Sequence, residues 1–458
     1  MEKKTPRVLL AGTGSGCGKT TVVCAILQAL ADRGKRLGAF KSGPDYIDPM
    51  FHSRIIGTKS ANLDPFFFDR NTMRYLLAKN GGEVSVIEGA MGFYDGAGLT
   101  TSRASSWETA CMTDTPVVLI VPARGAALSV LAAITGFLAF QEESHIRGVI
   151  LNRCTAMTYP ALAGEIRRRF AGRLEPLGFL PEMPACTLES RHLGLVTAGE
   201  VEDLQEKTRI LARQAEKTLD LDGLLALAES APPLTCEPVT LPEKEPVRIA
   251  VARDRAFCFY YEDNLEALRE MGGELAAFSP IDGEGLPKNV QGLYLGGGYP
   301  ELYAKALSGN RKMLRSIRAA LEGGLPCIAE CGGFMYLTER IGEWPTVGFL
   351  PGKCWDNGKL TRFGYVTLQA KEDNLLCRAG EEIRAHEFHH WDAEYPGEGF
   401  TARKPGGKAW ECAVVSERLY AGYPHFHFYA NPRFAERFYE ACIKEKQSHA
   451  GNCETNGH

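Results

Sequence analysis

The sequence lacks both an excess of positive charge and a long hydrophobic run. Its 458 residues carry 52 Lys and Arg against 56 Asp and Glu, a net charge of −4, which argues against a surface built for nucleic acid or an anionic membrane. The longest weakly polar stretch, 126–140, contains Ser129 and Thr135 and is too short to span a bilayer. Lys3 and Lys4 precede only a short apolar run, so we expect no secretory leader and a cytoplasmic location.

Cys-x-x-Cys pairs are also absent. The 14 cysteines are scattered along the chain, and none forms a Cys-x-x-Cys motif. A disulfide scaffold is typical of short secreted chains. We therefore expect free thiols in a reducing compartment.

The first half of the chain alternates short apolar runs with helical patterns. Expected strands are 8–11, 37–41, 84–88, 117–121 and 148–151, with helices over 20–33 and 126–141. Continuous apolar strands that alternate with helices predict a parallel sheet covered on both faces.

A composition break divides the chain, which is too long for one hydrophobic core. The stretch 231–246 is rich in Pro and Glu and has neither helical nor strand periodicity. We interpret it as a linker between a domain at 1–230 and a second α/β domain at 247–445. The polar residues 446–458 are expected to form a disordered tail.

A glycine-rich loop joins the first expected strand to the first expected helix, Gly12-Thr-Gly-Ser-Gly-Cys-Gly-Lys19-Thr20. In the usual phosphate loop, four residues separate the first Gly from the Gly-Lys pair. Here Thr13 occupies the position of that first Gly and Gly12 lies one residue earlier, so the loop is longer by one residue. The backbone of such a loop holds phosphates, a Lys reaches the terminal phosphates, and a hydroxyl binds Mg²⁺. We expect Gly14 and Gly16 to supply the positive φ values of the turn. The predicted ATP-binding residues are Gly12, Gly14, Gly16, Gly18, Lys19, Thr20 and Thr21.

Other chemically active residues follow the ends of the neighbouring strands. These segments are 41–48, 88–95 and Arg124. Since the carboxyl ends of parallel strands meet at one edge of a sheet, we expect them to lie near the glycine-rich loop.

The second half contains a cysteine at a predicted strand-to-helix turn. The run Leu325-Pro-Cys-Ile-Ala-Glu-Cys331-Gly332 predicts a strand that ends on Cys331, followed by a helix over 334–340. The sulfur at such a turn projects free of the sheet, and the helix N-terminus favours the thiolate. The N–H groups of Gly332 and Gly298 are the predicted oxyanion donors. A buried, inert cysteine is the alternative for Cys331 taken alone.

A thiolate nucleophile also needs a base. The run Tyr423-Pro-His425-Phe-His427-Phe428 alternates like a strand, which puts His425 and His427 on one face if the strand is regular. We predict that one of them is the base and the other its orienting partner.

This half resembles the class I glutamine amidotransferases, which hydrolyse glutamine to release ammonia. In that family a Gly-flanked Cys forms the nucleophile elbow, and the catalytic His is followed two residues later by a Glu. His425 matches the His, whereas His427 stands where the Glu is usual. The third member of the triad therefore stays open between His427 and another residue. The resemblance implies a flavodoxin-like α/β fold here and a P-loop NTPase-like parallel sheet in the first half.

Six further motifs are spread along nearly the whole chain: Lys41-Ser-Gly-Pro-Asp45-Tyr46-Ile47-Asp48-Pro49, Asn62-Leu-Asp64-Pro65, Val86-Ile-Glu88-Gly-Ala-Met-Gly92-Phe-Tyr-Asp95-Gly96, Arg191-His192-Leu-Gly-Leu195, Gly296-Gly-Gly-Tyr-Pro-Glu301 and His386-Glu-Phe-His389. Together they resemble the cobyrinate a,c-diamide synthase family. The first half is also similar to dethiobiotin synthetase, which shares the longer phosphate loop and activates a carboxyl group. The resemblance implies a ligase that uses ATP, Mg²⁺ and glutamine to amidate the a and c acetate carboxylates of a corrin ring, through an acyl phosphate, in cobalamin biosynthesis.

The resemblance also implies roles for individual residues. Lys19 would neutralise phosphate charge, and Thr20 and Glu88 would bind Mg²⁺. The substrate and phosphoryl site would hold Lys41, Asp45, Tyr46, Ile47, Asp48 and Asp95. Arg124 and Arg153 are further candidates for the other carboxylates of the substrate.

The expected partners are small molecules, cobyrinate or a related tetrapyrrole and L-glutamine, and a homodimer is left open. One alternative is the same amidation of hydrogenobyrinate or nickel sirohydrochlorin, which also offer acetate side chains. A more distant one is a nucleotide-switched binding ATPase with an inactive amidotransferase domain. The pattern His386-Glu-Phe-His-His390 matches zinc peptidases, but its surroundings alternate like a strand, and that chemistry needs a helix.

Overall fold

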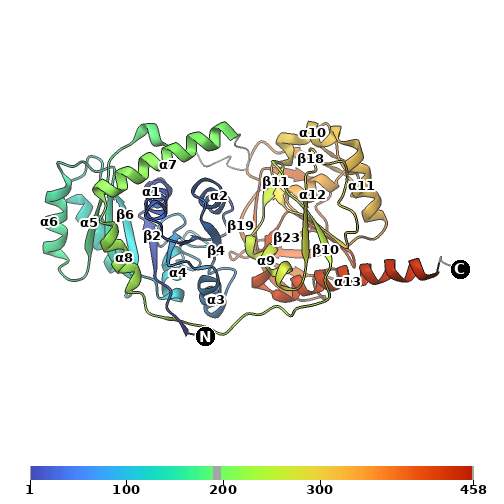
Figure 1. Cartoon of the computed structure of the whole chain (residues 1–458), viewed down its shortest axis with the longest axis horizontal. Helices are drawn as coiled ribbons and strands as arrows, with labels where there is room; N and C mark the ends of the chain where they lie inside the picture. Colours follow the sequence, from blue (N-terminus) through green and yellow to red (C-terminus); the bar gives the residue numbers. More distant parts are fainter. Residues whose placement is uncertain (1, 189–197, 456–458) are drawn as a thin grey trace. The chain divides into compact units, whose positions relative to one another are not determined.

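The computed structural model describes the backbone of residues 2–188 and 198–455 and the side chains of 2–188 and 201–448. The run Arg191–Leu195 lies outside these residues. The chain divides into two compact units, Met1–Val239 and Thr240–His458 (Figure 1). The division falls inside the stretch that the composition marks as a linker.

The N-terminal unit is built on a seven-stranded sheet in which every neighbouring pair is parallel. The predicted α/β fold with a parallel sheet is therefore confirmed. The order is β4-β3-β5-β2-β6-β7-β8, with bounds β2 Arg7–Gly12, β3 Leu37–Ser42, β4 Lys59–Leu63, β5 Val84–Glu88, β6 Val117–Pro122, β7 Ile146–Asn152 and β8 Glu175–Leu180. The two outer strands, β4 and β8, escape prediction because Lys, Ser, Asn, Pro and Gly interrupt their apolar runs.

Helices cover this sheet, and their apolar faces make the core of the unit. Helix α1 (Lys19–Asp32) lies against α7 (Ala198–Thr218), as Figure 1 shows, and α8 (Leu221–Glu229) lies against β2 and β5. Val22, Ile26 and Leu30 of α1 are fully buried in one cluster with Leu211 and Leu224. Such burial removes apolar surface from water and fixes the helix that begins at the phosphate loop. The other helices are α2 Ile47–Phe51, the π-helix His52–Ile56, α3 Arg70–Asn80, α4 Ser106–Thr113, α5 Ser129–Ala139 and α6 Tyr159–Arg169.

Part of the predicted linker is anchored to the N-terminal unit. Strand β9 (Leu234–Thr235) pairs with β1 (Glu2–Lys3) in an antiparallel ladder. Buried Arg7 donates to the backbone oxygen of Pro232 at 2.9 Å. All of these bonds reach backbone atoms of the predicted linker, and composition does not reveal such bonds.

The C-terminal unit contains a six-stranded sheet of order β12-β10-β13-β15-β25-β24. All its pairs are parallel except β24 with β25. The bounds are β10 Arg248–Ala252, β12 Glu274–Phe278, β13 Gly292–Leu295, β15 Cys327–Glu330, β24 Val414–Ser416 and β25 Leu419–Gly422. Helices α9 (Glu262–Glu270), α10 (Ala304–Gly309), α11 (Arg311–Glu322), α12 (Gly332–Leu337) and α13 (Pro432–Thr455) accompany it.

A second sheet of this unit is antiparallel, in the order β23-β22-β19-β20-β26. Its strands are β19 Arg362–Ala370, β20 Glu382–His389, β22 Phe400–Arg403, β23 Ala409–Cys412 and β26 His425–Phe426. His386 and His389 lie in β20, so the strand expected there is confirmed. Smaller sheets join β11 (Phe257–Phe259) with β14 (Gly297–Gly298), and β16 (Arg340–Ile341) with β17 (Trp344–Pro345), β18 (Lys353–Asp356) and β21 (Trp391–Ala393).

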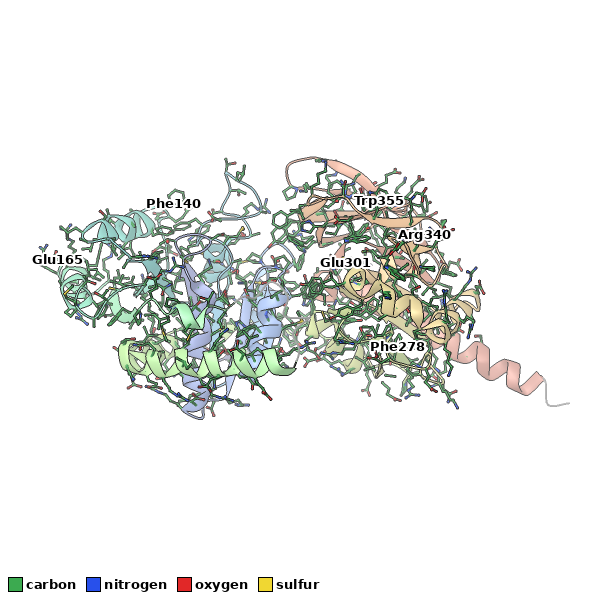
Figure 2. The ribbon with its side chains drawn as sticks, turned by 90° about the horizontal axis from the view of Figure 1, so that it is seen from above. Phe140, Glu165, Phe278, Glu301, Arg340 and Trp355 are labelled. Atoms are coloured by element: carbon green, nitrogen blue, oxygen red, sulfur yellow. The ribbon has the colours of Figure 1, made fainter. Side chains whose placement is uncertain are left out.

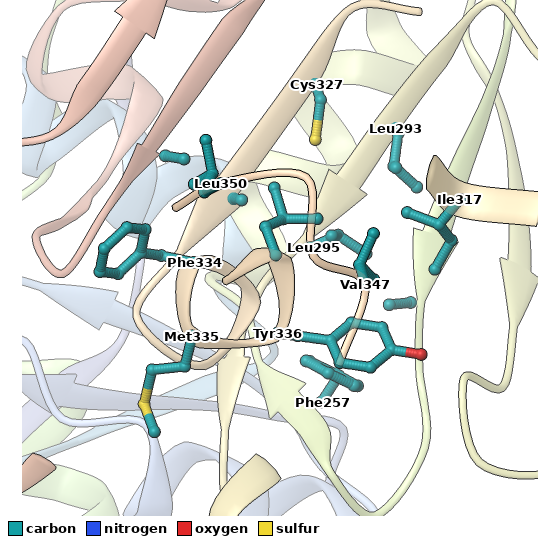
Figure 3. Packing of buried hydrophobic residues seen from close by; sticks show 14 of the residues in the cluster. Phe257, Leu293, Leu295, Ile317, Cys327, Phe334, Met335, Tyr336, Val347 and Leu350 are labelled. Carbon is teal, nitrogen blue, oxygen red and sulfur yellow. The ribbon is translucent and has the colours of Figure 1, made fainter. Parts of the chain in front are cut away.

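The short helix α12 is set in the hydrophobic core of the C-terminal unit. Figure 3 shows Phe334, Met335 and Tyr336 of this helix among Leu295 and Phe257. All residues of α12 are buried. By contrast, Phe140 of the N-terminal unit is 67% exposed (Figure 2). The helix that follows Cys331 is therefore held by packing along its whole length.

Helix α13 corrects the predicted disordered tail, because it continues to Thr455. Its first turns bury Phe434, Phe438 and Cys442, and helical hydrogen bonds extend the element into polar sequence. Within the described residues, no helix is both long and apolar enough to cross a membrane. Every cysteine in that part of the chain is a free thiol.

Candidate active sites

The glycine-rich loop lies between β2 and α1, as the sequence predicts. Gly16 and Gly18 take positive φ values of 75° and 88°, and Gly18 caps α1. Gly14 is not among the positive-φ residues, so its predicted conformation is wrong and Gly18 takes that role. A Cβ on Gly12 would lie 2.2 Å from Sγ of Cys17. Glycine at position 12 is therefore needed for the loop to close.

Lys19 lies across this loop. Its Nζ donates to the backbone oxygens of Gly14, at 3.1 Å, and of Met91. Burial lowers the pKa of Lys19. Asn152, at the end of β7, donates to the backbone oxygen of Cys17 at 2.8 Å and so also holds the loop. The sequence analysis does not single out Asn152, and its position is visible only after β7 is placed.

A buried network of charged and polar side chains adjoins the loop at the ends of β3 and β5. Thr20 Oγ1 donates to Glu88 Oε1 at 2.8 Å. Lys41 Nζ lies 2.5 Å from Asp48 Oδ2 and 3.2 Å from Glu88 Oε1. The structure thus brings together Thr20, Lys41, Asp48 and Glu88, all of which were predicted site residues.

Charge pairing in this network works against desolvation. Burial alone would raise the pKa of Glu88, but Lys41 and the hydrogen bond with His52 hold that pKa well below its ordinary value. Burial and the neighbouring charge of Glu88 raise the pKa of Asp48 well above its ordinary value. Lys41 is also buried, yet the charge of Asp48 raises its pKa. The site therefore keeps an ionised Glu88 beside a protonated Lys41.

His52 is a member of the network that sequence reasoning missed. Its Nε2 lies 3.2 Å from Glu88 Oε2, and both side chains are 0% exposed. It lies in the π-helix that follows α2, where no motif marks it. The contact arises because this segment passes β5 in three dimensions.

The other predicted substrate residues have local roles in the loops. Asp45 accepts hydrogen bonds from the N–H groups of Ile47, at 3.0 Å, and Asp48, at 3.4 Å. Asp95 accepts from the N–H of Gly92 at 2.8 Å. Tyr46 is buried. These bonds shape the loops at the carboxyl edge of the sheet.

The two arginines predicted near this site have different surroundings. Arg153 donates to the backbone oxygen of Gly16 at 3.4 Å, on the phosphate loop. Arg124 is exposed and pairs with Glu182 at 2.8 Å. Arg153 therefore contacts the loop directly, whereas Arg124 is engaged with a surface carboxylate.

The oxygens of Thr20 and Glu88 suit Mg²⁺. This ion takes hard oxygen ligands and is usually held by one or two protein groups together with nucleotide phosphates. A hydroxyl and an ionised carboxylate 2.8 Å apart at the phosphate loop match that requirement. No group of three or more His, Cys, Asp or Glu side chains arranged to hold a metal occurs among the residues described.

The second site is built around Cys331, at the turn from β15 into α12. Its backbone has φ 48° and ψ −101°, an unfavourable conformation for a residue with a side chain. The N–H of Cys331 donates to Gly422 of β25 at 2.8 Å. A Cβ on Gly333 would lie 2.2 Å from the backbone oxygen of Leu295. The predicted strand-to-helix elbow is present, with the strained turn typical of nucleophile elbows.

The two predicted oxyanion donors lie close together. Gly298 has φ 156°, and a Cβ there would lie 2.1 Å from the backbone oxygen of Ala256. A Cβ on Gly332 would lie 3.2 Å from the backbone N of Gly298. The N–H groups of Gly298 and Gly332 are thus placed beside the same turn as Cys331.

His425, on β26, is hydrogen-bonded to Cys331. Burial would lower the pKa of His425, but hydrogen bonds with Cys331 and Glu330 outweigh it and raise the pKa to about 10. Its Nδ1 lies 3.5 Å from Glu330 Oε2. A Cβ on Gly297 would lie 2.5 Å from Cε1 of the ring, so this glycine leaves the space that the imidazole fills.

The surroundings of His427 differ from the sequence prediction. Strand β26 ends at Phe426, so the alternation that would put both histidines on one face does not reach His427. Nε2 of His427 lies 3.6 Å from Asp263 of α9, and its ring is 4.9 Å from that of Tyr261. Its Nδ1 accepts from the N–H of Tyr429 at 3.3 Å. His427 therefore faces α9, and the orienting role predicted for it has no support in this geometry.

Comparisons with known proteins match both units. A family model described as the CobQ/CobB/MinD/ParA nucleotide binding domain matches residues 8–196, and one described as the CobB/CobQ-like glutamine amidotransferase domain matches 248–433. The cobyrinate a,c-diamide synthase of Caldanaerobacter subterraneus is 39% identical over 95% of this chain and 98% of its own length. That of Listeria monocytogenes (strain F2365) is 38% identical over 93% and 97%. The solved structure of PurLQS from Thermotoga maritima covers 43% of this chain and 98% of its own, with 18% identity and a TM-score of 0.33.

Proposed function

The chain belongs to the cobyrinate a,c-diamide synthase family, and from this premise we propose that it uses ATP, Mg²⁺ and glutamine to amidate the a and c acetate groups of cobyrinate. The observation that carries the proposal is a single alignment, at 39% identity, that spans 95% of this chain and therefore both units. The reaction needs an activated carboxylate and a source of ammonia, and each unit has a site suited to one of them.

In the proposed glutamine reaction, the thiolate of Cys331 attacks the carboxamide carbon of glutamine. The N–H groups of Gly298 and Gly332 stabilise the negative oxygen of the tetrahedral intermediate. The C–N bond then breaks, His425 gives a proton to the departing ammonia, and a thioester remains on Cys331. Water hydrolyses this thioester to glutamate and restores the thiol.

In the proposed ATP reaction, a carboxylate oxygen of the substrate attacks the terminal phosphorus of ATP. The backbone of the phosphate loop and Lys19 hold the phosphates and offset their charge. ADP leaves, and the acyl phosphate reacts with ammonia to give the amide and inorganic phosphate. Mg²⁺, held by Thr20 and Glu88, would supply further charge compensation on the phosphates. Two such cycles convert both acetate groups.

The loops that carry Asp45, Tyr46, Ile47, Asp48 and Asp95 are the proposed substrate-binding region. Lys41 is buried in the ion network, so its proposed role is to keep Glu88 and Asp48 in place. Arg153, which follows β7 and contacts the phosphate loop at Gly16, is the better placed of the two arginines to meet a substrate carboxylate. We place the enzyme in the cytoplasm, with small molecules as its partners. Light scattering in solution distinguishes a monomer from a homodimer.

A nucleotide-switched binding ATPase with an inactive amidotransferase unit is the less favoured function. Such a unit has no need for a strained cysteine hydrogen-bonded to a histidine, and both are retained here. Release of glutamate from glutamine separates the two functions.

The test is to incubate the protein with ATP, Mg²⁺, glutamine and cobyrinate, and to measure the product mass. We expect gains of one and then two amides, and little conversion of hydrogenobyrinate or nickel sirohydrochlorin in parallel reactions. Equal or faster conversion of either alternative would contradict the assignment of cobyrinate. Omission of ATP is the control and should abolish amidation of each macrocycle.

A further inference from the structure

A buried carboxylate lies beside Cys331 and has no part in the reaction described so far. Glu330 is the last residue of β15, immediately before the nucleophile, and its residue exposure is 1%. An ionised carboxylate at such depth is strongly unfavourable unless donors or a cation compensate it. Its partners therefore indicate what it does.

These partners come from the two strands that flank the site. Tyr294 of β13 donates its hydroxyl to Glu330 Oε2 at 3.3 Å, and the N–H of Phe426 donates to Oε1 at 3.5 Å. Nδ1 of His425 lies 3.5 Å from Oε2. The carboxylate thus meets both the ring of His425 and the backbone of the next residue. It is placed to set the position and the rotation of the imidazole together.

Because Nδ1 of His425 contacts Glu330, its other ring nitrogen, Nε2, is available to the thiol of Cys331. When Nδ1–H donates to a carboxylate, Nε2 is free to exchange a proton with the nucleophile. His425 is also hydrogen-bonded to Cys331. The order along this chain of contacts is therefore carboxylate, imidazole, sulfur.

We propose that Glu330 is the positioning residue of the glutaminase site. It accepts the Nδ1–H of His425, holds the ring toward Cys331 and stabilises the imidazolium. It replaces the Glu that is usual two residues after the His, at the place that His427 occupies here. This inference rests on the proposed glutamine hydrolysis and names a further residue for it.

Other ionisable groups lie near His425. Cys331 is hydrogen-bonded to it at the elbow, and His386 lies directly opposite it where β20 pairs with β26. Glu387 and His389 of β20 interact with it only electrostatically. Burial lowers the pKa of His386 to about 3 and that of His389 to about 4, so both rings are neutral near pH 7. Burial raises the pKa of Glu387 to about 7. Glu387 is thus a second buried carboxylate in the same unit, which makes it a matched control.

The test compares Glu330→Gln with Glu387→Gln, each measured for glutamate release with and without ATP and cobyrinate. Gln keeps the size of Glu330 and its capacity to accept a hydrogen bond but removes the charge that stabilises the imidazolium. We expect kcat for glutamate release to fall by about 100-fold or more in Glu330→Gln, with KM for glutamine changed less than about threefold. Glu387→Gln should keep the wild-type kcat. Glu330→Asp, which retains the charge, should recover part of the loss.

A second readout follows the thiolate directly. The rate at which iodoacetamide alkylates Cys331, measured by mass spectrometry of its peptide across pH, reports the thiol–imidazolium pair. We expect this profile to move upward by about one pH unit or more in Glu330→Gln and to stay in place in Glu387→Gln. A purely structural effect of the substitution would lower activity without moving the profile.

Wild-type kcat in Glu330→Gln, or an unmoved alkylation profile, would overturn the proposal. Ammonia-dependent amidation reports folding of the N-terminal unit, and circular dichroism reports that of the C-terminal unit.

Should Glu330→Gln not fold, the ¹⁵N–¹H spectrum of ¹⁵N-histidine-labelled wild type decides. A strongly downfield Nδ1–H resonance, absent in His425→Gln, supports the proposal, and no such resonance overturns it. Failure of the proposed function is distinct, because the wild type itself would then release no glutamate.

Discussion

The two candidate sites place their reactive groups in different ways. In the N-terminal unit, Lys41, Asp48, Glu88 and His52 form a buried network, in which Lys41 contacts both carboxylates and Glu88 contacts both Lys41 and His52. In the C-terminal unit, the candidate site is centred on one thiol, that of Cys331 on a strained turn, which is hydrogen-bonded to His425. In the network, each member contributes both to the stability of the fold and to the candidate site. At the elbow, the reactive thiol can be replaced without loss of the contacts that stabilise the fold. Loss of one group should therefore have different consequences in the two units.

The largest effect expected is on the elbow. Cys331→Ser should lower glutamine-dependent amidation by at least about 1,000-fold, because a serine hydroxyl is a far weaker nucleophile than a thiolate. Amidation with ammonium salts as nitrogen source should stay within about threefold of wild type, since the ATP reaction does not use this thiol. Product formation with each nitrogen source, measured by mass spectrometry, tests both statements.

Cys111→Ser is the control for this experiment. Cys111 is a partly buried cysteine of the N-terminal unit, and both activities should survive its replacement. Loss of ammonia-dependent amidation in Cys331→Ser would mean that the sites are not separable, and the contrast between them would fail.

Removal of Lys41 tests the network. Lys41→Met leaves the buried carboxylates of Asp48 and Glu88 without their cation, which should destabilise the fold by about 3 to 5 kcal/mol. Urea unfolding followed by circular dichroism measures the loss. The same variant should lose amidation with glutamine and with ammonia alike, in contrast to Cys331→Ser.

Lys35→Met provides the comparison, because Lys35 is exposed in the same unit. We expect its unfolding free energy to stay within about 0.5 kcal/mol of wild type. If Lys41→Met were equally stable, the buried charges would not depend on one another, and the description of this site as a network would be wrong.

The smallest effect is a pH dependence that only the glutamine reaction should show. Hydrogen bonds with Cys331 and Glu330 raise the pKa of His425 to about 10, so its charged form persists from below pH 6.5 up to that value. Glutamate release should therefore lack a histidine inflection near pH 6.5. Above pH 10 it should fall about tenfold per unit, or about 1.4 kcal/mol, as the proton donor for the departing ammonia is lost.

Initial rates of glutamate release in overlapping buffers measure this profile. Ammonia-dependent amidation, which bypasses His425, should not share the fall that this group causes. An inflection of glutamate release near pH 6.5 would show instead that His425 titrates like an ordinary histidine.

Local patterns in the sequence were sufficient for the backbone that carries both sites. The apolar runs at β2, β3, β5, β6 and β7, the glycines before Lys19 and the Cys331-Gly332 turn each predict their local structure. Predictions failed where pairing or packing over long distances decides. β4 and β8 form because they pair with β3 and β7, although their own sequences are weakly apolar. Helix α13 extends through sequence that was expected to be disordered.

By itself, then, the sequence determined two α/β units, a phosphate loop, a cysteine elbow and the resemblance that joins them. Only the tertiary structure decided which side chains complete each site. His52 reaches Glu88, and Asn152 reaches the loop at Cys17, over separations that no local motif records. His425 is near Glu330, while His427 pairs with Asp263. The reason is physical: hydrogen bonds and ion pairs act between atoms a few ångströms apart, and folding brings distant residues to that separation.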